Sequence, residues 1–133
     1  MTSAFAGKGF MRHEAKRILI VEDKVIIAMD VEDMVSDCGC VPVGPVSNVA
    51  DGIALVQKTA LDGAVLDINL GEERVWPLAE VLDDQGVKIV LASGYATTEV
   101  PARFRDRPML EKPLSQRALA AALESLGLIQ PRS

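Results

Sequence analysis

Residues 18–23 read Ile-Leu-Ile-Val-Glu-Asp, which is four consecutive apolar residues followed by two acids. A strand with one face in water alternates apolar and polar residues, whereas this run is apolar on both faces. The run therefore indicates a strand of a parallel sheet that helices cover on both sides. The acidic pair falls at the carboxyl end of that strand, where open α/β sheets hold their functional residues.

Four further apolar runs follow at roughly even intervals, at residues 41–46, 64–66, 89–92 and 109–110. The third and fourth of the five runs are also apolar on both faces, so they suit the centre of the sheet. The second contains Pro42 and Pro45, which cannot donate hydrogen bonds to a neighbouring strand, and it therefore belongs at an edge. The fifth run is short, which also favours an edge.

Segments with helical periodicity separate the strands. Ser47 and Ser115 are good N-cap residues, and a glycine follows three of the segments. We predict helices over Val25–Cys38, Asn48–Thr59, Pro77–Gln85 and Ser115–Leu126. The stretch Ala96–Arg107 has only weak helix signals, because it contains two threonines and Pro101, and it predicts a short or frayed helix at most.

This alternation predicts an α/β fold: a doubly wound (βα)5 parallel sheet with the flavodoxin-like strand order 2-1-3-4-5. We assign residues 16–127 to one domain, residues 1–15 to a flexible N-terminal tail and residues 128–133 to a C-terminal tail. The whole chain of 133 residues is one domain's worth of sequence, and 49% of it is hydrophobic.

Charge and composition narrow the function further. The net charge of −5 argues against nucleic acid or an anionic membrane as partner, and no apolar run is long enough to cross a membrane. The start of the chain lacks the apolar stretch of a secretory signal, so we expect a cytoplasmic protein. Cys38 and Cys40 lack the spacing of a zinc or redox site, and we expect two small buried or half-buried residues. The single histidine, His13, lies in the tail, so catalysis by a Ser-His-Asp or Cys-His arrangement within the domain is excluded.

Chemistry-bearing residues gather at the predicted carboxyl ends of four strands: Glu22 and Asp23, Asp67, Ser93, and Lys112. In the order 2-1-3-4-5 these strand ends are neighbours, so we expect the side chains to meet in one crevice. Three carboxylates in one place need a cation, and hard oxygen ligands favour Mg²⁺. A lysine and a hydroxyl opposite them can bind phosphoryl oxygens. Together these residues indicate phosphoryl transfer to an aspartate.

The motifs Ile-Leu-Ile-Val-Glu22-Asp23, Ala-Val-Leu-Asp67-Ile-Asn69-Leu, Leu-Ala-Ser93-Gly and Lys112-Pro113 resemble those of response-regulator receiver domains in two-component signalling. The resemblance spans about residues 16–127 and implies one role for each motif residue. Asp67 is the phosphoacceptor, Asp23 binds Mg²⁺ directly, Glu22 supports it through water, Asn69 offers its backbone carbonyl to the metal, and Ser93 and Lys112 bind the phosphoryl group.

Two positions depart from the usual family pattern. Met109 stands where most receivers carry an aromatic switch residue, three positions before the lysine. The segment Ala-Ser93-Gly-Tyr95 resembles an alphaproteobacterial subgroup with an Ala-Thr-Gly motif at this point. Because Met109 has no ring to move, we expect Ser93 to respond to the phosphoryl group. Tyr95 either responds together with it or is a half-buried loop residue without a role in signalling.

The resemblance implies a stand-alone signalling protein rather than an enzyme in the ordinary sense. Its expected partners are a sensor histidine kinase or a histidine phosphotransfer protein, a downstream protein target, and a second copy of the chain in a weak homodimer. Three alternatives remain open at this stage. They are a flavodoxin-like FMN carrier, an aspartyl-phosphate hydrolase, and a pseudo-receiver that docks without being phosphorylated.

Overall fold

The computed structural model describes residues 14–94 and 99–131, and its centre is a five-stranded parallel sheet. The strand order is β2-β1-β3-β6-β7. The strands are β1 (Arg17–Val21), β2 (Val41–Val46), β3 (Gly63–Asp67), β6 (Lys88–Ser93) and β7 (Met109–Glu111). Counted within this sheet, the order is the predicted 2-1-3-4-5. The proline-containing strand β2 and the short strand β7 form the two edges, as their sequences predict.

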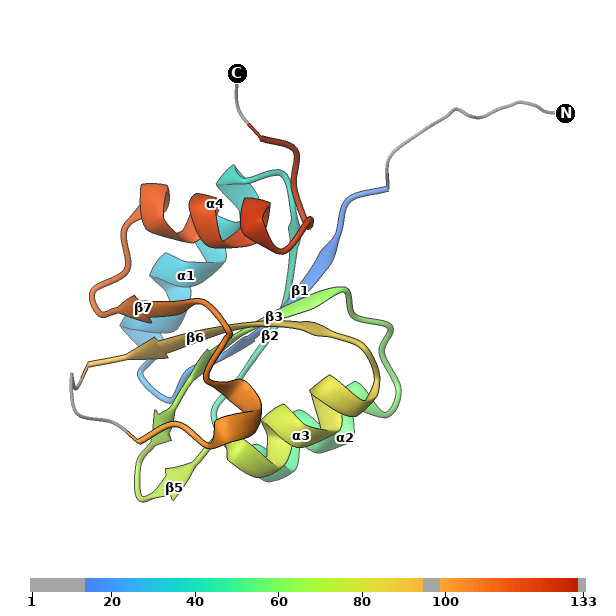
Figure 1. Cartoon of the computed structure of the whole chain (residues 1–133). Coiled ribbons are helices and arrows are strands. Elements are labelled where there is room, and N and C mark those ends of the chain that lie inside the picture. Colours follow the sequence, from blue (N-terminus) through green and yellow to red (C-terminus); the bar gives the residue numbers. More distant parts are fainter. Residues whose placement is uncertain (1–13, 95–98, 132–133) are drawn as a thin grey trace, which may run out of the picture.

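Helices cover both faces of the sheet (Figure 1). Helices α1 (Val25–Asp37) and α4 (Gln116–Ser125) lie on one face, and α2 (Val49–Val56) and α3 (Trp76–Asp84) lie on the other. Strand β1 shows why its run is apolar throughout. Ile18 and Ile20 pack on the α1 and α4 side, whereas Leu19 and Val21 pack on the α2 and α3 side. Successive strand residues point to opposite faces, so both faces of a covered strand must be apolar.

The helix ends follow local sequence signals. Ser115 caps α4, because its side chain accepts a hydrogen bond from the backbone N–H of Ala118. At α2 the prediction was one residue early: Asn48, not Ser47, is the cap, and its side-chain oxygen accepts from the N–H of Asp51. Helix α2 also ends at Val56, before the predicted Thr59.

The connection between β6 and β7 differs from the other crossovers. In its described part only one 3₁₀ turn forms, η1 (Ala102–Phe104), which agrees with the short or frayed helix expected over residues 96–107. Pro101 precedes the turn, and a proline cannot donate the hydrogen bond that an α-helix would need at this point. The described residues therefore contain four α-helices rather than the five of an ideal (βα)5 fold.

A small hairpin follows β3 and was not predicted. It consists of β4 (Asn69–Leu70) and β5 (Glu73–Arg74), which pair antiparallel. Strands of two residues are too short for an alternating pattern to be visible in the sequence. The hairpin matters for the site because it begins two residues after Asp67.

An aromatic and charged cluster attaches η1 to α3. Phe104 is buried and stacks on Trp76, with the ring centroids 5.7 Å apart. Arg103 and Arg107 lie over the same phenyl ring, and both bind the carboxylate of Asp83. Asp83 has a lowered pKa, because Arg103 and then Arg107 donate hydrogen bonds to it and outweigh the opposing effect of its burial.

Three remaining expectations concern the cysteines, membrane spans and the N-terminal tail. Cys38 is half-buried and Cys40 is buried, as expected for small residues at the boundary between α1 and β2. Within the described ranges, no helix has the length and apolar character that a membrane span requires. Most of the predicted tail over residues 1–15, including His13, lies outside the described residues.

Candidate functional site

Three carboxylates meet at the carboxyl ends of β1 and β3. Asp67 is the last residue of β3 and is buried, and Glu22, also buried, directly follows β1. Asp23 is next in the chain and half-buried. Because β1 and β3 are hydrogen-bonded neighbours, their ends bring these residues together, and one oxygen of each lies within 4.8 Å of the others. Such a group of negative charges requires a cation close by.

Lys112 places its ammonium group between two of these carboxylates. Its Nζ is 2.8 Å from Glu22 Oε1 and 3.0 Å from Asp67 Oδ2. The residue directly follows β7, and its backbone N–H donates to the carbonyl of Ser93, 3.0 Å away. The side chain is only 14% exposed, so water screens these contacts weakly. The position of Lys112 is therefore fixed from both its backbone and its side chain.

Burial and pairing shift two pKa values in this cluster. Burial raises the pKa of Glu22, and the hydrogen bond from Lys112 reduces this effect without cancelling it. Burial alone would lower the pKa of Lys112, but hydrogen bonds to Glu22 and Asp67 outweigh it and raise the pKa. Lys112 is therefore a cation throughout the physiological pH range.

The donor set fits a hard divalent cation such as Mg²⁺. Oδ1 of Asp23 is buried and accepts no hydrogen bond in the described part of the chain. Its nearest cation, Lys24 Nζ, is 4.0 Å away, which is too far for a hydrogen bond. A buried carboxylate oxygen without a donor is costly unless a charge compensates it. Glu22, Asp23 and Asp67 thus offer the oxygen ligands that Mg²⁺ prefers.

Asn69 and Ser93 lie beside Asp67. The backbone N–H of Asn69 donates to Asp67 Oδ1 at 3.3 Å, so the two oxygens of that carboxylate face different donors. Ser93 is the last residue of β6 and is buried. The residue before it, Ala92, pairs with Asp67 across the sheet, so Ser93 lies one position beyond the acceptor on the neighbouring strand.

Of the other two predicted switch positions, Met109 and Tyr95, only Met109 lies within the described residues. Met109 begins the edge strand β7, and 42% of its surface is exposed. It is not among the residues that line the pocket around Asp67. Tyr95 lies outside the described residues, so its role remains a prediction.

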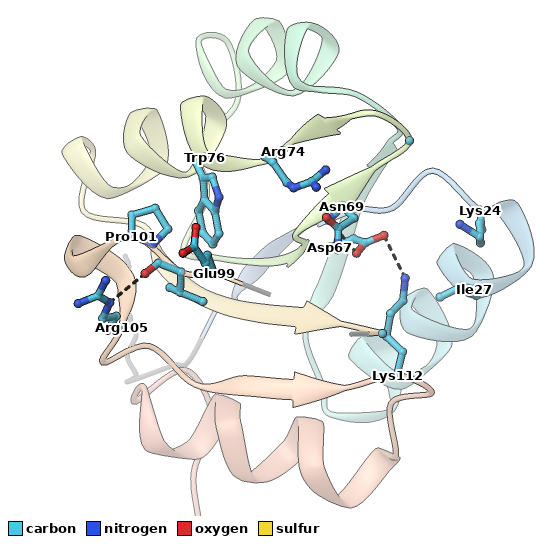
Figure 2. Close-up of a pocket in the computed structure, with 13 residues that line it drawn as sticks. Lys24, Ile27, Asp67, Asn69, Arg74, Trp76, Glu99, Pro101, Arg105 and Lys112 are labelled. Carbon is cyan, nitrogen blue, oxygen red and sulfur yellow. Dashed lines mark hydrogen bonds and ion pairs between the residues drawn. The ribbon is translucent and has the colours of Figure 1, made fainter. Parts of the chain in front are cut away.

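A pocket of about 1140 Å³ opens over Asp67 and extends well beyond it. Figure 2 shows Asp67, Asn69 and Lys112 at one end and Trp76, Glu99 and Pro101 further along. Arg74 and Trp76 also line this pocket, and sequence reasoning missed both. The hairpin places Arg74 opposite Asn69, so it would have pointed to Arg74 if it had been predicted.

Comparison with known proteins agrees with this geometry. No protein-family model and no curated protein matches the chain. Among solved structures, SdrG from Sphingomonas melonis Fr1 is 42% identical, over 84% of this chain and 96% of that one, with a TM-score of 0.75. The BeF3-activated conformation of SdrG from Pseudomonas melonis Fr1 also shares 42% identity, over 88% of this chain and 100% of that one, with a TM-score of 0.73.

A third solved structure carries the family name directly. A response regulator receiver protein from Sinorhizobium medicae WSM419 is 33% identical, over 85% of this chain and 94% of that one, with a TM-score of 0.70. The sheet order, the acidic cluster and these similarities together define the class of protein. The chain belongs to the response-regulator receiver family of two-component signalling.

Proposed function

We propose that Asp67 accepts a phosphoryl group from a phosphohistidine of a sensor histidine kinase or a histidine phosphotransfer protein. The observation that carries this proposal is the contact of 3.0 Å between Lys112 Nζ and Asp67 Oδ2 inside the three-carboxylate cluster. A carboxylate oxygen of Asp67 attacks the phosphorus as the P–N bond to the donor breaks. The imidazole nitrogen keeps that electron pair, and the product is an acyl phosphate.

The residues around Asp67 have complementary tasks in this step. The ammonium group of Lys112 neutralises charge on the phosphoryl oxygens. Glu22 and Asp23 together with Asp67 would hold Mg²⁺, with the Asn69 carbonyl as a further ligand. When bound, the ion supplies Lewis-acid stabilisation of the transferring phosphoryl group. The Asn69 N–H orients one oxygen of Asp67.

The phosphodonor docks, in this proposal, on the first turns of α1. Val25 and Ile26 are 72% and 76% exposed there, and Met29 is 57% exposed. Lys24 and Ile27 in the same segment line the pocket over Asp67, so this apolar surface is continuous with the rim of the site. An apolar surface beside a phosphoacceptor suits a partner that must bring its phosphohistidine close and then leave.

Docking and chemistry can be separated experimentally. Ile26→Ser should slow phosphoryl transfer from a phosphorylated histidine kinase or phosphotransfer protein, while labelling by the small donor acetyl phosphate stays unchanged. Equal effects on both donors would show that the substitution disturbs the site itself. Equal rates of transfer from the protein donor to the wild type and to Ile26→Ser would place docking elsewhere.

The phosphorylated chain signals, in this proposal, through changed contacts with a protein target. The phosphoryl group would draw in the Ser93 hydroxyl at the end of β6, and Tyr95 two residues later would report the change. Met109 does not take part through ring rotation. SdrG supports such a change, because its solved structures include a BeF3-activated conformation. Beryllofluoride stands in for a phosphoryl group on a carboxylate.

The direct test is labelling by acetyl phosphate in the presence of Mg²⁺. Wild-type protein should gain one phosphoryl group, and Asp67→Asn should gain none while keeping its fold. An unlabelled wild-type protein would favour the alternative of a pseudo-receiver that docks without phosphorylation.

A further inference from the structure

Arg74 lies on the hairpin that follows β3 and lines the same pocket as Asp67. In the β4–β5 pair Asn69 is directly opposite Arg74. The pairing continues one step further, because the N–H of Val75 donates to the carbonyl of Ile68 at 3.0 Å. Asp67 is two residues before Asn69, the partner of Arg74, so this register makes Asp67 the diagonal neighbour of Arg74. Diagonal neighbours of an antiparallel pair are within reach of a long side chain.

The backbone that carries Arg74 is held on both sides. On one side Glu73 Oε2 accepts a hydrogen bond of 3.2 Å from the N–H of Val49, at the start of α2. On the other side the Val75 side chain is fully buried in the core. The guanidinium of Arg74 is itself exposed and lines the pocket over Asp67. Because the backbone is already fixed, only the side chain of Arg74 has to be ordered when it binds a ligand.

The charge of Arg74 is unpaired in the described part of the chain, where no carboxylate comes within 4.0 Å of it. Arg103 and Arg107 contrast with it, because both are bound to Asp83. Figure 2 shows Arg74 beside Asn69, with Lys112 reaching Asp67 from the other side. The planar guanidinium of an arginine can donate two parallel hydrogen bonds to phosphate oxygens.

We propose that Arg74 binds the phosphoryl group on Asp67, as a second cation opposite Lys112. The inference rests on the proposed phosphorylation of Asp67. Phosphorylation adds a charge of about −1.5 to −2 and three acceptor oxygens. Lys112 is the one side-chain cation that contacts Asp67 in the described residues. Beside Lys112, Ser93 and Mg²⁺, the three phosphoryl oxygens keep lone pairs that the fork of Arg74 can bind. Arg74 contacts the phosphoryl group directly in the phosphorylated state, whereas in the unphosphorylated state it has no carboxylate partner among the described residues.

The experiment is a titration of beryllofluoride in saturating Mg²⁺, with bound fluoride counted by fluorine NMR. Arg74→Gln should weaken beryllofluoride binding about tenfold, which is the effect of one charge-assisted hydrogen bond. Arg74→Lys keeps the charge but not the fork, and its affinity should fall between the two. Mg²⁺ affinity without beryllofluoride, measured by calorimetry, should stay equal or increase, because a repelling cation is gone.

Arg117→Gln is the matched control, because Arg117 is exposed on α4, away from the pocket. It should bind beryllofluoride like the wild type. If Arg74→Gln bound beryllofluoride within twofold of the wild-type affinity, the inference would be overturned. Slower transfer from a protein donor to that variant would then make Arg74 a docking residue and would not rescue the inference. A parallel loss of Mg²⁺ affinity would also overturn it. Failure of the wild type to bind beryllofluoride would instead refute the proposed function.

Discussion

Lys112 Nζ lies 3.0 Å from Asp67 Oδ2, although the two residues are 45 positions apart in the chain. The two residues are close because β3, β6 and β7 are neighbouring parallel strands, so their carboxyl ends lie side by side. Lys112 also contacts Glu22, so a single ammonium group compensates two buried carboxylates. Removal of the lysine should therefore affect metal binding and phosphoryl binding in opposite directions.

The first prediction follows from that opposition. Lys112→Ala should bind Mg²⁺ as tightly as the wild type or more tightly, because the competing cation is gone, while beryllofluoride binding is lost. Calorimetry measures the first quantity and fluorine NMR the second. Lys88→Ala, at the exposed start of β6, is the control and should change neither. Weaker Mg²⁺ binding by Lys112→Ala would contradict the assignment.

The second prediction concerns Asp23, whose buried Oδ1 accepts no hydrogen bond in the described part of the chain. Asp23→Asn should reduce Mg²⁺ affinity about tenfold or more, because it removes one of the few anionic groups at the metal site. Asp37→Asn, which changes an exposed acid at the end of α1, should leave the affinity unchanged and so controls for net charge. If calorimetric titrations of the two variants coincide, Asp23 is not a ligand.

The third prediction concerns pH and the cluster that fastens η1 to α3. The pKa of Asp83 is lowered in the folded protein, so its stabilisation is complete above the ordinary aspartate pKa and disappears as pH falls through the lowered value. Asp83→Asn should cost a few tenths to about 1 kcal/mol at neutral pH, since water screens much of the network. Urea unfolding of both proteins should give converging stabilities in acid. A difference independent of pH would reject the electrostatic account.

A fourth prediction tests the packing of α2 against α3. A Cβ added at Gly52 would lie 2.5 Å from Cδ2 of the fully buried Leu78. Gly52→Ala should therefore destabilise the fold by about 1–3 kcal/mol through overpacking, despite the better helix propensity of alanine. Urea unfolding measures the change. If the double variant Gly52→Ala/Leu78→Val regained stability relative to Gly52→Ala, the loss would be due to this contact. An unchanged unfolding midpoint in Gly52→Ala would refute the prediction.

The sequence predicts the sheet better than the segments between its strands. Strand β1 is apolar on both faces and β2 contains two prolines, so each run indicates its place in the sheet directly. The gathering of Glu22, Asp67 and Lys112 follows from that order. Arg74 was missed because its place depends on the pairing of two-residue strands, which leave no periodic pattern. The contacts of Phe104 depend on tertiary packing, which local sequence does not encode.

The central claim is that Asp67, and not another acid of the cluster, carries the phosphoryl group. Borohydride reduction of acetyl phosphate-labelled protein converts an aspartyl phosphate to homoserine, which peptide mass spectrometry can locate. We predict homoserine at position 67 alone, and none when EDTA removes Mg²⁺ during labelling. Homoserine at position 23, or the same yield in Asp67→Asn protein, would contradict the account.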